Sequence, residues 1–142
     1  MRSLTRYLLL TPILFSGTGA PVMAAPPDAT RALQNYTLNC QGCHLADASG
    51  MEGRVPRLRG EVGRFLHVPG GREYLIRVPG VATTPLDDAA LAELMNWLLG
   101  EFSATELPDD FRPYTAAEVG ALRRHPLVEV EAARARLLQS MR

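Results

Sequence analysis

Two cysteines separated by two residues and followed at once by a histidine constrain this chain more than any other feature. Cys40, Cys43 and His44 form the pattern Cys-Gln-Gly-Cys-His, and the 142-residue sequence contains only these two cysteines. A disulfide across so short a spacing would close a very small loop and would stabilise the fold little. The pattern therefore has to be explained by chemistry other than a cross-link between distant segments.

Cys-x-x-Cys-His is the pattern through which haem is attached covalently to protein. Two thiols about one helical turn apart can form thioethers with both haem vinyl groups, and the next residue then projects its imidazole toward the iron. The sequence predicts one covalently attached haem c, held through Cys40 and Cys43, with His44 as the proximal iron ligand.

Three other interpretations of the cysteine pair stay open at this point. A zinc site would need a fourth ligand and usually a second paired cluster. A thioredoxin-like redox pair would need a βαβ context, and none follows the motif. A structural disulfide would leave His44 unexplained. The signal-like N-terminus, the lack of further cysteines and the flanking sequence favour haem over all three.

The first 24 residues are typical of a secretory signal peptide. Arg2 and Arg6 supply the positive start, and small side chains precede the predicted cleavage near Ala24. The apolar run 7–15 is too short to span a bilayer and is interrupted by Pro12. We therefore predict export to the periplasm, with no transmembrane segment in the mature chain.

Helical patterns flank the motif on both sides. Residues 28–38 predict a first helix, and 85–100 predict an amphipathic last helix with Asp87 as its N-cap and Gly100 as its end. A glycine-punctuated loop, 46–53, follows the motif and leads to Pro56 and Leu58. A short element over 72–78, bracketed by Gly-Gly and Pro-Gly, is also expected to be helical.

These residues together resemble a class I cytochrome c domain, from about residue 28 to residue 102. The resemblance implies a small all-α domain, residues 25–104, folded around one covalent haem with its first helix crossing its last. It also implies that the Pro56 carbonyl accepts the His44 N–H, which would fix the orientation of the imidazole. Leu58 and Trp97 are then candidates for the haem pocket.

The resemblance fails at the sixth iron ligand. Members of the family usually supply a methionine from the loop before the last helix, but the stretch 76–84 holds neither methionine nor histidine. His67 is our candidate distal ligand, since it follows the proline loop, and an open or weakly ligated iron is at least as well supported. Met51 is expected in a loop, Met95 in the core and His125 at the surface. Axial ligand identity is a main determinant of haem potential and reactivity.

Residues 105–142 continue past the usual end of such domains. Thr115 and Glu118 form a capping box that opens one helix, and 127–141 predict a second. We interpret this segment as a helical extension folded onto the haem domain, although it could instead bind a partner. The 15 basic residues are all arginine and balance 15 acidic ones. Arginines gather in 51–80 and acidic residues in 86–110. Such runs of charge are usually solvated faces, and we favour that interpretation over a polarised docking surface.

Taken with the resemblance, these features predict an electron carrier rather than an enzyme. Its partners would be periplasmic redox proteins such as a dehydrogenase or a terminal oxidase or reductase. A haem protein that binds a gas or sulfur species at an open distal site is one alternative. An electron-transfer subunit of a dehydrogenase complex is the other. The sequence contains no pattern typical of nucleic-acid binding.

Overall fold

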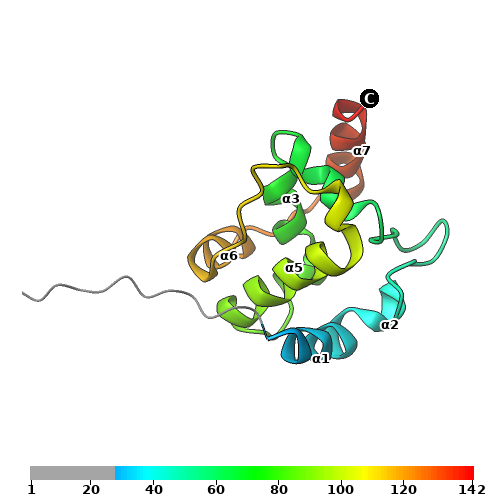
Figure 1. Ribbon diagram of the computed structural model, residues 1–142. Coiled ribbons are helices and arrows are strands. Elements are labelled where there is room, and N and C mark those ends of the chain that lie inside the picture. Colours follow the sequence, from blue (N-terminus) through cyan, green and yellow to red (C-terminus); the bar gives the residue numbers. More distant parts are fainter. Residues whose placement is uncertain (1–27) are drawn as a thin grey trace, which may run out of the picture.

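The computed structural model describes residues 28–142, and this part of the chain contains helices and no strand (Figure 1). The all-α prediction is therefore confirmed, and the predicted signal peptide lies outside the described residues. The elements in chain order are α1 (Ala29–Asn39), α2 (Gln41–His44), η1 (Val62–His67), α3 (Gly71–Arg77), α4 (Pro79–Ala82), α5 (Asp88–Ser103), η2 (Ala104–Glu106), α6 (Ala116–Arg123) and α7 (Val130–Ser140).

Helices α1 and α5 pack side by side and form one wall of the core. The Asp28 carboxylate caps α1 by accepting from two backbone N–H groups, and the Asp87 carboxylate caps α5 by accepting from one, that of Ala90. At the contact, Tyr36 of α1 packs against Trp97 and Phe102 of α5, with ring centroids 5.8 and 5.2 Å apart. These aromatic contacts fix α1, and hence the motif that follows it, against α5.

Helix α5 is longer than the sequence predicted. We expected it to end at Gly100, but it continues to Ser103. A terminating glycine normally adopts the left-handed conformation, and Gly100 is not among the glycines with positive φ. The apolar residues Leu99 and Phe102 are buried, and their packing carries the helix past the glycine.

The loop between α2 and η1 doubles back on itself beneath the motif. Met51 and Val55 exchange two backbone hydrogen bonds, and the Gly50 N–H donates to the His44 carbonyl at 3.0 Å. Gly50 has φ +67°, and a Cβ there would run into the carbonyl oxygens of Val55 and Pro56. Glycine is therefore needed for the sharp return that brings Pro56 back to His44.

The C-terminal segment folds onto the helices that precede it. Helix α6 packs against α3 and α5, and α7 contacts α3. Tyr114, which leads into α6, is buried, and its backbone N–H and carbonyl both bond the Asn96 side chain. Thr115 caps α6 as predicted, but Glu118 bonds Arg72 instead of reaching back to the cap. Within residues 28–142 no helix is long and apolar enough to cross a membrane.

Candidate haem site

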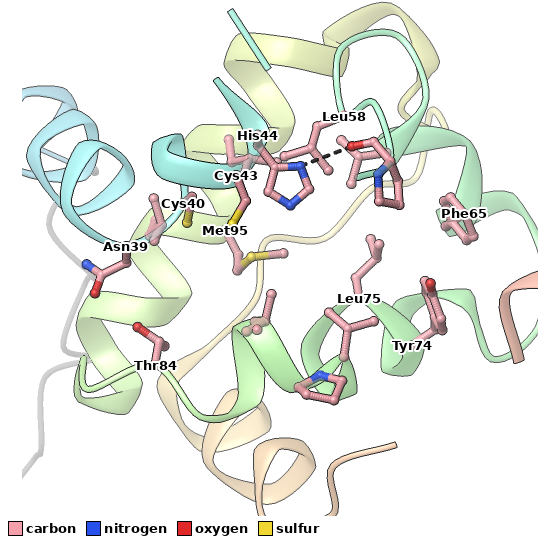
Figure 2. Close-up of a pocket in the computed structure, with 18 of the residues that line it drawn as sticks. Asn39, Cys40, Cys43, His44, Leu58, Phe65, Tyr74, Leu75, Thr84 and Met95 are labelled. Atoms are coloured by element: carbon pink, nitrogen blue, oxygen red, sulfur yellow. Dashed lines mark hydrogen bonds between the residues drawn. The ribbon is translucent and has the colours of Figure 1, made fainter. Parts of the chain in front are cut away.

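A cavity of about 340 Å³ opens beside the cysteine motif (Figure 2). Its lining is predominantly apolar and comes from α2, the proline loop, η1, α3, α4, α5 and α7. The residues that line it include Cys40, Cys43, His44, Pro56, Arg57, Leu58, Phe65, Leu75, Val78, Pro79, Gly80, Val81, Thr84, Met95 and Arg134.

The His44 imidazole is held in one orientation by the proline loop. Its Nδ1 lies 3.0 Å from the Pro56 carbonyl oxygen. The carbonyl can only accept, so Nδ1 carries the proton and Nε2 is left with a free lone pair. Figure 2 shows the second ring nitrogen facing the cavity. Burial lowers the pKa of His44, and the bond to Pro56 opposes that shift only in part, so the neutral form is favoured.

The two thiols lie on one helical turn at the same wall of the cavity. Cys40 accepts at its carbonyl from the backbone N–H groups of Cys43 and His44, which closes this turn. Both thiols are free; Cys40 is half-buried and Cys43 is exposed. Burial, and secondarily the neighbouring Cys43, raises the pKa of Cys40 to about 11. The Cys40 thiol is therefore protonated at neutral pH.

Among the described residues, no three side chains of the His, Cys, Asp and Glu types gather as a metal-binding group. The zinc interpretation of the motif therefore finds no ligand set in residues 28–142. The imidazole, the two thiols and an apolar cavity form a different donor set, which suits a porphyrin with a single protein-derived nitrogen ligand.

The structure brings Pro56 and Leu58 to the cavity but not His67 or Trp97. His67 is exposed, and its Nε2 lies 2.9 Å from the backbone oxygen of Glu106. The 3-10 turn of η1 directs it toward η2, away from the cavity. Trp97 lies at the α1–α5 contact, where it packs against Tyr36 and Phe102. Trp97, which we expected in the haem pocket, therefore packs between α1 and α5 instead of lining the cavity.

The remaining candidates for a sixth ligand divide between the cavity and the surface. Met51 does not line this cavity, and His125 is exposed. Met95 is buried in the core, as predicted, and in addition lines the cavity. In Figure 2 it lies on the Cys43 side of the cavity. It is the one thioether that the described residues bring to this lining.

Most of the lining was not predicted from the sequence, including its residues Thr84 and Arg134. Thr84 stands in the stretch 76–84, which holds neither methionine nor histidine. Arg134 comes from α7, and its guanidinium lies over the Phe65 ring at 5.6 Å from the centroid. One signal for Arg134 was present, because it is an arginine on the otherwise apolar face of the predicted second helix. Among residues 28–142, the arginines that line the cavity are Arg57 and Arg134, and no acidic side chain of these residues lines it.

A Cys-x-x-Cys-His turn beside an apolar cavity, enclosed by short helices, defines a small c-type cytochrome. No family model matches the sequence. Two relatives named cytochrome c-552 do match, one from Thermus thermophilus and one from a particular strain of that species. Each is 32% identical over 102 residues, which cover 59% of this chain and 78% and 69% of the respective relatives. The chain belongs to the class I c-type cytochromes.

Proposed function

We propose that this protein is an exported monohaem electron carrier. One haem is attached through Cys40 and Cys43, and His44 is the proximal ligand of its iron. The observation that carries the proposal is the His44–Pro56 contact, because it presents Nε2 to an apolar cavity walled by both thiols. His67 is not part of the proposed site, since its Nε2 is engaged with the Glu106 carbonyl outside the cavity.

The lining residues fit a haem in polarity as well as in donors. Leu58, Phe65 and Leu75 supply apolar surface, and apolar walls exclude water from the porphyrin faces. Haem propionates are anionic, and Arg57 and Arg134 offer guanidinium groups suited to carboxylates. Because Arg134 lies on α7, the C-terminal extension would contribute directly to holding the cofactor.

Bound haem supplies one-electron chemistry, and the protein sets its surroundings. The Pro56 carbonyl holds the Nδ1 proton and so keeps the imidazole neutral and oriented in both redox states. Attachment at the exposed Cys43 keeps one haem edge near the surface, where a partner can approach. Partners would be redox proteins such as a dehydrogenase and a terminal oxidase or reductase.

Expression of the full chain in a host that matures c-type cytochromes tests the proposal. We expect periplasmic protein whose mass is that of a cleaved polypeptide plus one haem, with a reversible one-electron titration. C40A or C43A should lose one thioether bond and most of the yield of haem protein. H44A should retain covalent haem but lose the spectrum of histidine ligation. Q41A lies between the two cysteines and is the matched control.

Two results would overturn the proposal. The first is a normal secreted form that lacks haem and carries a Cys40–Cys43 disulfide. The second is a Q41A protein that loses haem as completely as C40A, because the cysteines would then have no specific role.

A further inference from the structure

A cation from the C-terminal extension stands at the edge of the haem cavity across from the cysteines. Figure 2 shows Cys40 and Cys43 on one side of the cavity and Phe65 and Tyr74 on the other. The two aromatic rings stack with their centroids 5.2 Å apart. Arg134 of α7 lines the cavity at this edge, because its guanidinium carbon lies 5.6 Å from the centroid of the Phe65 ring.

The covalent attachment determines which part of a haem faces this edge. The vinyl groups of a haem and its propionates stand on opposite edges of the porphyrin ring. With the vinyl groups bound at Cys40 and Cys43, the propionates of the proposed cofactor would project toward Phe65 and Arg134. Propionates are carboxylates, and a guanidinium beside an apolar cavity is a favourable partner for a carboxylate.

A second cavity adjoins the haem cavity at the proline loop. It is more open, has a volume of about 480 Å³, and shares Pro56, Arg57 and Arg134 with the haem cavity. Arg54 also lines it, and Glu52 is the acidic residue among the described residues of its lining. Since Arg57 and Arg134 line both cavities, they stand where the haem cavity opens toward solvent. Carboxylates that leave the haem cavity here would meet a predominantly cationic rim.

The Tyr74 hydroxyl is a second donor at the same edge. Tyr74 is buried, with 8% of its surface exposed, and lines the haem cavity. Burial raises the pKa of Tyr74, and the positive charge of Arg134 opposes that rise in part, so the hydroxyl lies in the field of the guanidinium. A neutral hydroxyl and a permanently charged guanidinium together suit an ionised carboxylate.

Helix α7 is otherwise held only lightly on the domain. None of its residues is fully buried, and no side chain caps its N-terminus. The segment before it is fixed to α3, because the Leu127 N–H donates to the Arg77 carbonyl at 2.8 Å and the Arg77 side chain donates to the His125 carbonyl at 2.7 Å. A bond from Arg134 to the haem would add a fixed point within α7 itself.

We propose that α7 closes the haem site at this edge: Arg134 and the Tyr74 hydroxyl bind a haem propionate, and the bond holds α7 in place. The proposal rests on the haem site proposed above and gives the C-terminal extension a function. Helix α7 covers the propionate edge and leaves the edge at the exposed Cys43 open to partners. The positive charge of Arg134 disfavours the more positive ferric state and so raises the reduction potential.

The test uses protein that has been shown to contain one haem per chain. Hydrogen exchange of the α7 amides measures how firmly the helix is held, and a redox titration measures the midpoint potential. R134M keeps the length of the side chain but removes its charge. It should lower the potential and speed exchange in α7 about fivefold, the factor that corresponds to about 1 kcal/mol for a partly exposed ion pair. R134K should restore both values in part.

Two further variants make the result specific. R136M removes the same charge from an exposed residue of the same helix, and should leave exchange and potential at their wild-type values. Y74F keeps the stacked ring but removes the hydroxyl, and should lower the potential by less than R134M does.

An R134M protein that matches R136M in both measurements would overturn the proposal. If only exchange changes, Arg134 holds α7 merely by packing on Phe65; if only the potential changes, the contact does not hold α7. Either result contradicts the proposal. So does a wild-type potential that shifts when phosphate replaces chloride at equal ionic strength, because a free anion would then occupy the arginines. Protein without covalent haem would instead overturn the proposed function itself.

Discussion

Arg123 is the residue whose loss should disturb this fold most clearly. Its side chain is 15% exposed and bridges α6 to the loop before α5 through three backbone carbonyls and the Asp88 carboxylate. R123M keeps the length of the stem but leaves those acceptors without a donor. The Asp88 side chain is 46% exposed, so most of the loss comes from the backbone carbonyls that no longer have a charged donor. Hydrogen bonds to a charged group contribute about 1.5–3 kcal/mol. For a domain of this size that corresponds to a loss of roughly 5–12 °C in Tm.

Thermal unfolding of the haem-loaded protein, followed by far-ultraviolet circular dichroism, measures this directly. R123K should recover part of the loss, since an ammonium can reach some of the carbonyls but cannot span all of them. R124M changes the neighbouring arginine, which is exposed, and should shift stability by no more than about 0.5 kcal/mol. If R123M melts within 3 °C of the wild type, which is roughly 1 kcal/mol or less, the bridge does not hold the loop as argued.

The structure also predicts the direction in which pH and two glycine substitutions change the stability of the fold. The Arg72 guanidinium holds the pKa of Glu118 below its usual value, so the bond stabilises the fold above about pH 4.3 and is lost as pH falls through the folded-state pKa. The urea midpoint should therefore drop from pH 5 toward pH 3, and E118Q should flatten that dependence. G71A forces a Cβ onto the Phe65 carbonyl and should cost about 1–3 kcal/mol in urea unfolding. G100A has open space within a helix and should gain about 0.5–1 kcal/mol; equal effects at the two glycines would contradict this reasoning.

The helices could be predicted from the sequence because the capping residues and the spacing of the buried apolar residues both indicate a helix at the same positions. Asp28 and Asp87 stand at helix starts and cap α1 and α5 through their carboxylates. The C-terminal end of α5 was harder to predict, because the sequence does not distinguish a glycine inside a helix from a glycine that ends one. The burial of Phe102, which depends on contacts with Tyr36 more than sixty residues earlier, decides the matter.

The candidate site was only partly predictable, for a related reason. Cys40, Cys43 and His44 are adjacent in sequence, so their chemistry is a local pattern. The partners that complete the cavity come from distant segments, and nothing in the spacing shows that Arg134 of α7 reaches the same cavity as Pro56. His67 was proposed from its place along the chain, yet the direction of the η1 turn sends it to Glu106 instead.

The C-terminal extension and the missing methionine are connected through one loop. In class I cytochromes an iron ligand anchors the loop before the last helix, and here the corresponding stretch 76–84 contains no such residue. Arg123 anchors that loop at its carbonyls instead, from the side away from the cavity. A loop held from outside does not need an iron–ligand bond to stay in place. The C-terminal extension therefore supplies an anchor for this loop through Arg123 of α6.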